Sequence, residues 1–155
     1  MSTTESSRAH AAADPRTGSI LATVEIGVPP ERVFRALTSE EIIKWWVRAG
    51  VFDTREWSGD VRVGGKWRSA GIARGAPYVL EGEYLEVDPP RKLVHTWHMS
   101  GMPGVPTVVT YLLEPVGTGT RITLRHEGFA VPAASAGACA GWETSFVRLA
   151  ELLAA

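Results

Sequence analysis

The sequence has little of what disulfide-bonded, membrane-spanning or strongly charged proteins need. Its single cysteine, Cys139, cannot form an intramolecular disulfide, so we expect a reducing compartment. No run of about eighteen apolar residues occurs, which argues against insertion into a membrane. The formal net charge is −1, with acidic and basic residues mixed along the chain, so no charged surface for nucleic acid is expected. Together these absences predict a cytoplasmic protein.

Motifs for metal ions and phosphates are absent as well. No His-x-His, His-x-x-x-His or Cys-x-x-Cys spacing is present, so we predict no metal site and no cofactor. The pair Gly64-Gly65 is not followed by the Gly-Lys-Ser/Thr of a phosphate-binding loop. Cys139 has no base or cation beside it in the sequence that would activate it as a nucleophile. No catalytic residue can therefore be named from motifs.

The chain length of 155 residues predicts one domain. Residues 1–18 are rich in Ser, Thr and Ala and lack the apolar segment of a secretory signal, so we expect a disordered tail followed by a single domain at 19–155. Alternating apolar residues and Gly/Pro turns predict seven strands, at 19–28, 52–57, 60–72, 78–88, 92–99, 107–115 and 120–129. Within the third of these, Gly64-Gly65 predicts a bulge that bends the sheet.

Three helices complete the predicted elements. A short helix at 31–37 can begin at Pro30, and a second short helix follows Ser39 as its N-cap. The last helix is predicted at 138–153, where Trp142, Phe146, Leu149 and Leu153 form one apolar stripe.

Several of these segments together resemble a known family, the activator of heat-shock-protein-90 ATPase homologue-like branch of the SRPBCC (START-like) superfamily. The matching segments, in order, are Val28-Pro29-Pro30-Glu31-Arg32-Val33-Phe34, Trp45-Trp46, Asp60-Val61-Arg62-Val63-Gly64-Gly65-Lys66-Trp67, Gly82 to Trp97, Gly119 to Phe129, and Gly141-Trp142. The resemblance covers roughly residues 20–153 and rests on the order and spacing of the segments.

The resemblance implies an α+β helix-grip fold, in which a seven-stranded antiparallel sheet wraps around the C-terminal helix and leaves a cavity. It also implies binding of an apolar small molecule and a connection to the stress response. At 155 residues the sequence has no segment that matches the additional domain of the eukaryotic co-chaperone, so we do not expect activation of the heat-shock ATPase. Its segment 130–140 is almost entirely Ala, Gly, Ser and Pro. We expect that segment to form a mobile cavity mouth.

Strand alternation predicts which side chains face the cavity. His126 shares a face with two apolar neighbours on its strand, and the hairpin turns place it and His95 on the two strands that flank the one carrying Tyr111. Two strand spacings are about 9–10 Å, too far for both imidazoles to bind one metal ion. The apolar stripe of the last helix offers no evident partner to this histidine row, which consists of His95, Tyr111 and His126. We therefore expect the row to orient a ligand, unless buried neighbours satisfy each histidine.

The predicted ligand cavity combines this row with apolar and aromatic walls. Its residues are Trp67, Tyr78, Tyr84, His95, Trp97, Val109, Tyr111, Leu113, Leu124, His126, Phe129, Trp142 and Phe146. Trp45 and Trp46 are interpreted as structural.

Three functions fit the sequence. The first is a protein that binds an aromatic or lipid-like small molecule. The second is a cyclase-, aromatase- or hydrolase-like enzyme that uses a cavity His or Tyr as acid or base. The third is an interaction module for a chaperone, and whether the chain forms a homodimer stays open.

Overall fold

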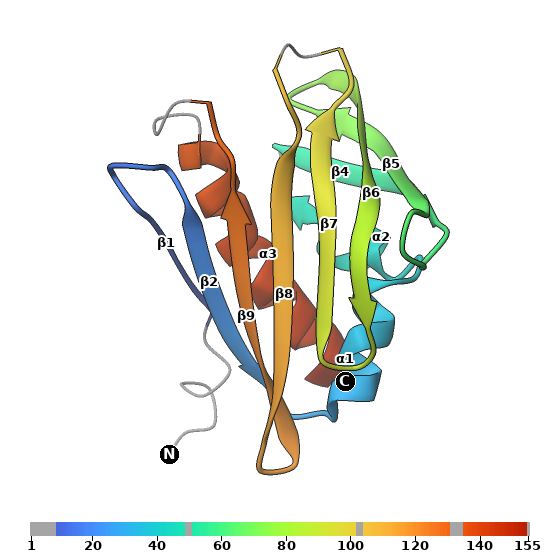
Figure 1. Ribbon diagram of the computed structural model, residues 1–155, viewed down its shortest axis with the longest axis vertical. Helices are drawn as coiled ribbons and strands as arrows, with labels where there is room; N and C mark the ends of the chain where they lie inside the picture. The colour runs from blue at the N-terminus through green and yellow to red at the C-terminus, as the bar shows by residue number, and fades with distance from the viewer. Residues whose placement is uncertain (1–8, 49–50, 102–103, 131–134, 155) are drawn as a thin grey trace.

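The computed structural model describes residues 9–48, 51–101, 104–130 and 135–154, and a curved antiparallel sheet around one long helix dominates it (Figure 1). The strands are β1 (His10–Ala13), β2 (Ile20–Ile26), β3 (Val47–Arg48), β4 (Phe52–Gly59), β5 (Lys66–Ala73), β6 (Ala76–Asp88), β7 (Lys92–Met99), β8 (Thr107–Val116) and β9 (Gly119–Glu127). The helices are α1 (Pro30–Leu37), α2 (Ile42–Trp45) and α3 (Ala136–Ala154). The order in the sheet is β1-β2-β9-β8-β7-β6-β5-β4-β3. This is the expected α+β helix-grip architecture.

Helix α3 lies across one face of the sheet, as Figure 1 shows, and contacts β1, β2, β3 and α2. The predicted apolar stripe is the buried face of this helix: Trp142, Phe146, Leu149 and Leu153 are all buried. The strands supply the other half of the core through alternating positions, as in β2, where every second residue from Ile20 onward is buried. The core therefore lies between α3 and the concave face of the sheet.

The sheet has nine strands rather than the seven expected. The two additional strands, β1 and β3, lie at its two edges. Strand β1 falls within the tail that was predicted to be disordered, so that prediction is wrong for His10–Ala13; residues 1–8 lie outside the described residues. The small side chains of β1 give no clear alternation, and β1 forms because the edge of β2 and the Glu143 carboxylate, which accepts a hydrogen bond from the Ala11 N–H at 3.1 Å, offer it partners.

The Gly64-Gly65 pair does not lie inside a strand, so the predicted bulge at this position is wrong. The two glycines belong to the turn between β4 and β5, where Gly64 has a φ of 84° and the Gly65 N–H donates to the Arg62 carbonyl at 2.8 Å. A Cβ on Gly65 would overlap the Asp60 carbonyl oxygen. The register shifts that bend the sheet lie instead in β4, between Thr54 and Glu56, and in β6, next to Tyr84.

The remaining predicted elements are close to those observed. Helix α1 begins at Pro30, as predicted. Helix α3 begins at Ala136, two residues before its predicted start, so the small residues that suggested a mobile segment are in part helical. Residues 131–134 lie outside the described part of the chain. Within the described part, no helix is long and apolar enough to cross a membrane.

Candidate functional site

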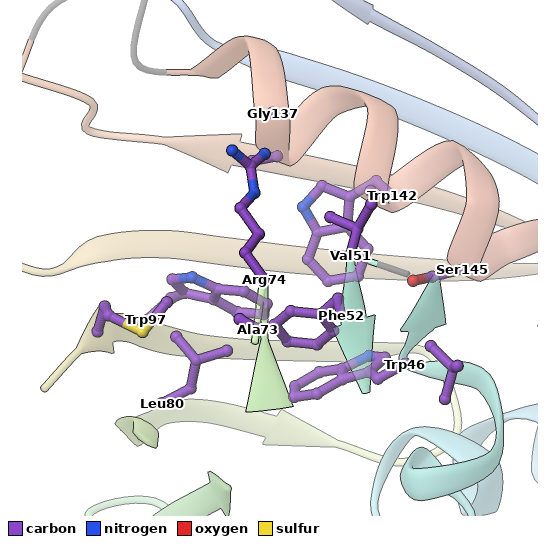
Figure 2. Close-up of a pocket in the computed structure, with 14 residues that line it drawn as sticks. Trp46, Val51, Phe52, Ala73, Arg74, Leu80, Trp97, Gly137, Trp142 and Ser145 are labelled. Carbon is purple, nitrogen blue, oxygen red and sulfur yellow. The ribbon is translucent and has the colours of Figure 1, made fainter. Parts of the chain in front are cut away.

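A cavity of about 310 Å³ lies between the first half of α3 and one end of the sheet (Figure 2). Its lining comes from β3 and β4, from the β5–β6 hairpin, from β7, and from one face of α3. The apolar side chains in this lining are mostly large: Trp46, Phe52, Leu80, Trp97, Met99 and Trp142. Cavities of roughly 300–1,000 Å³ with mostly apolar walls are typical of small-molecule sites.

Three tryptophan rings form one side of the cavity. The Trp46 ring centroid lies 5.2 Å from that of Trp97 and 6.4 Å from that of Trp142, and the Trp97 and Trp142 centroids are 5.3 Å apart. The planes are tilted or perpendicular to one another, the arrangement that aromatic pairs prefer. A flat apolar ligand would therefore find ring edges and ring faces on the same wall.

The indole N–H of Trp46 is the unusual group in this wall. Trp46 is only 3% exposed, and its Nε1 has no hydrogen-bond partner among the described residues. The other buried indoles are paired: Trp45 Nε1 donates to the Ala36 carbonyl at 2.9 Å, and Trp67 Nε1 donates to the Thr96 carbonyl at 3.1 Å. A buried donor without a partner costs about 1–3 kcal/mol. Water does not reach this atom either, so solvent does not offset that cost.

Helix α3 contributes small residues to the lining of the cavity. Gly137, Ala138 and Gly141 line it, and a Cβ added to Gly141 would meet no atom within 4 Å. Ser145, one turn further along the same face, adds a hydroxyl group. Larger side chains at these positions would occupy the space that a ligand needs.

Arg74 supplies the charge at the cavity. It occupies the two-residue turn between β5 and β6, and Figure 2 shows its side chain extending along the cavity toward Gly137. Arg74 is exposed, and no acidic side chain pairs with it among the described residues.

The predicted histidine row lies behind the Trp142 wall. As expected, His95 and His126 both point inward and are level with each other, since each pairs with Val109 across the sheet. The helix does supply a partner, contrary to expectation: Trp142 Nε1 donates to His126 Nδ1 at 3.0 Å. The second nitrogen, His126 Nε2, lies 2.7 Å from Thr107 Oγ1.

These contacts fix the protonation of His126. Because Nδ1 accepts the indole N–H, the imidazole is neutral and its proton is on Nε2, which donates to Thr107. The Thr107 hydroxyl in turn donates to the Trp97 carbonyl at 3.1 Å. Burial, reinforced by the charge that His95 would carry, lowers the pKa of His126 to about 3. Both ring nitrogens are thus engaged, and neither is free to exchange a proton with a ligand.

His95 is neutral for a similar reason. Burial lowers its pKa to about 4, and its Nδ1 lies 2.9 Å from the Thr96 carbonyl, to which it donates. The rings of Tyr84 and Tyr111 flank it at 6.0 and 5.9 Å. Burial raises the pKa of both phenols, so all three groups are uncharged near pH 7.

Replacing Trp142 with phenylalanine tests this network. The ring is kept but the donor is lost, so His126 Nδ1 is left buried and unpaired, and we expect a loss of about 2 kcal/mol in the free energy of unfolding. Urea denaturation measures it. The matched control is Trp57→Phe, because no hydrogen bond of the Trp57 indole is present in the described structure and the ring is only half-buried. Equal losses in the two variants would contradict the network.

The thirteen predicted cavity residues divide into two groups. Trp97 and Trp142 lie in the wall of the cavity described above. The others pack in the core or, for Phe129, partly against it: Trp67, Tyr78, Tyr84, His95, Val109, Tyr111, Leu113, Leu124, His126, Phe129 and Phe146. Contact between these eleven side chains and a ligand stays a prediction.

Sequence reasoning missed most of this lining. Trp46 was interpreted as structural, and its neighbour Trp45 does have that role, with its ring fully buried. Arg74 was not singled out, although an Arg-Gly pair between two strand-like runs is a turn signal that could have revealed its place. The described residues contain no group of three His, Cys, Asp or Glu side chains that could hold a metal ion.

Comparisons with known proteins agree on the architecture. The family model described as "Activator of Hsp90 ATPase homolog 1-like protein" matches residues 27–154. A structure from Chromobacterium violaceum is 28% identical with a TM-score of 0.75, covering 88% of this chain and 96% of its own. One from Mesorhizobium loti is 29% identical with a TM-score of 0.67, covering 86% and 96%. One from Nitrosomonas europaea is 27% identical with a TM-score of 0.74, covering 88% and 94%. No curated protein matches the chain.

Proposed function

The chain belongs to the family of activator of Hsp90 ATPase homolog 1-like proteins, and from its cavity we propose that it binds a small apolar molecule that contains one or two rings. The observation that carries this proposal is the cavity itself: about 310 Å³ of space with three tryptophan rings in its wall. A core without a ligand role would normally be closed by side chains.

The size of the cavity favours a compact ligand over a long lipid chain. Its volume lies near the lower end of the range for small-molecule sites. Its walls combine tryptophan rings with the small residues of α3. This lining suits a flat molecule that is bound between the helix and the sheet.

Binding is better supported than acid–base catalysis. A general acid or base must reach the substrate with a free nitrogen or oxygen. His126 uses both ring nitrogens within the protein, and His95 donates its Nδ1 proton to a backbone carbonyl. Neither histidine lines the cavity.

The variant Gly141→Leu tests the proposal. A leucine side chain at this position would project into open space in the cavity, and it replaces a poor helix former, so we expect stability to rise by about 0.5–1 kcal/mol while ligand binding falls at least tenfold. Titration with 1-naphthylacetamide, followed by tryptophan fluorescence, measures the binding.

The matched control is Ala140→Leu, which places the same side chain on the exposed side of α3. This control should bind the probe as the unmodified protein does. Undiminished binding in Gly141→Leu would count against the cavity as the binding site.

A further inference from the structure

We infer that the ligand is an aromatic carboxylic acid, whose carboxylate is bound by Arg74 and the first turn of α3 while its ring lies among the cavity tryptophans. This inference rests on the proposed function, since it assigns the chemical class of the molecule that the same cavity takes. It is carried by three features that meet at one end of the cavity: a charge, a helix terminus and a strained turn.

Arg74 is the only charged side chain among the described residues that line this cavity. Its guanidinium group makes no ion pair with a described acidic residue, in contrast to Arg32, which pairs with Glu41 at 2.7 Å. Guanidinium groups bind carboxylates with two parallel hydrogen bonds, so an unpaired arginine beside an apolar cavity favours a ligand that brings the carboxylate.

The backbone at Arg74 has an unfavourable conformation. Ala73 and Ala76 are paired across the hairpin, and the two turn residues have positive φ angles, 50° for Arg74 and 80° for Gly75. Such two-residue turns favour Asn, Asp or Gly, and Arg74 is the only non-glycine residue with a positive φ in the described chain. The Arg74 N–H donates to the Val51 carbonyl at 2.9 Å, which fixes the turn beside the cavity. A residue kept in an unfavourable conformation is a candidate for a functional role.

The beginning of α3 adds a second source of positive potential. Gly137 and Ala138, in its first turn, line the cavity, and Figure 2 shows the Arg74 side chain extending toward Gly137. The N-terminus of a 19-residue helix carries a partial positive charge, and this first turn contains no acidic residue that would neutralise it. The cavity therefore has positive potential at one end, beside walls that are mostly apolar.

Three probes that share one ring system but differ in charge separate the contribution of charge to binding from that of apolar contact. They are 1-naphthylacetate, the neutral 1-naphthylacetamide and the cationic 2-(1-naphthyl)ethylamine, each titrated by calorimetry into the full chain. We expect the acid to bind about tenfold more tightly than the amide, a difference of about 1.4 kcal/mol, and the amine to bind most weakly. The preference for the acid should shrink at high salt.

The variant Arg74→Asn tests whether Arg74 causes the preference for the acid. Asparagine tolerates a positive φ, so this variant should be at least as stable as the unmodified protein. Its preference for the acid over the amide should fall well below tenfold, and the first turn of α3 accounts for any preference that is left. Arg125→Asn, the same exchange at an exposed position of β9, should keep the tenfold preference.

The outcomes are distinguishable. Equal affinities for acid and amide in the unmodified protein would overturn the inference about the ligand class and leave the proposed binding function standing. Absence of binding by all three probes would overturn both. A tenfold preference that persists in Arg74→Asn would overturn the role of Arg74.

Discussion

Lowering the pH from 7 to 4.5 is expected to reduce the free energy of unfolding by about 5 kcal/mol, because two histidines are buried in the neutral form. Burial lowers the pKa of His126 to about 3 and that of His95 to about 4, whereas an unfolded histidine titrates near 6.5. Between these values the unfolded chain binds protons that the folded chain does not. The contribution of the two neutral histidines to the free energy of unfolding is therefore present above about pH 6.5. It declines as the pH falls toward 4, by about 2.5 kcal/mol for each histidine.

The hydrogen bonds of His126 give a structural reason for part of this pH dependence of stability. A proton on Nδ1 would remove the acceptor of the Trp142 indole, so the folded protein resists protonation at this atom. The variant His126→Gln keeps one acceptor and one donor but does not titrate. Its stability should fall only half as steeply with pH in urea denaturation measured between pH 7 and 4.5.

His10 provides the control, because it is exposed on β1. His10→Gln should leave the pH dependence as in the unmodified protein. Identical slopes for His126→Gln and the unmodified protein would show that His126 is not buried in the neutral form.

Replacing Gly82 with alanine is expected to lower the free energy of unfolding by about 3 kcal/mol. Gly82 lies in β6 opposite Trp67, and a Cβ at this position would overlap the Thr96 carbonyl oxygen and the indole nitrogen of Trp67. That carbonyl is the acceptor of the Trp67 N–H. Because one of the overlapping atoms belongs to the backbone of β7, a change of side-chain rotamer cannot relieve the clash.

Gly27→Ala is the matched control for this prediction. A Cβ on Gly27 would meet no atom within 4 Å, and its φ is not positive, so the same exchange should leave stability nearly unchanged. Urea denaturation of both variants tests the comparison. A loss below about 1 kcal/mol for Gly82→Ala would contradict the close approach of β6 and β7.

Local patterns in the sequence predict the strands and the buried face of α3 well, because alternation and helical spacing report directly on which residues are buried. They do not predict β1 and β3. These two edge strands are short, and their pairing depends on the strand beside them rather than on their own side chains. The Gly64-Gly65 turn was misread for a related reason, since glycines within a strand-like run fit either a bulge or a turn.

The site was harder to predict than the fold. The inward direction of His95 and His126 follows from alternation, and the structure confirms it. Their partners do not follow from alternation, because the contact of Trp142 with His126 depends on how α3 is rotated and placed over the sheet. The lining of the cavity likewise combines β4, the β5–β6 turn and α3, segments whose proximity no local pattern encodes.

The central claim is that the space beside Gly141 holds a small aromatic acid. A native mass spectrum of the protein and of its Gly141→Leu variant, both purified from the protein's own source, tests it most directly. We expect the unmodified protein to carry a bound mass that collision releases as an anion of a one- or two-ring acid, and the variant to carry none. The same bound mass on both proteins, or a ligand-free unmodified protein under these conditions, would contradict the claim.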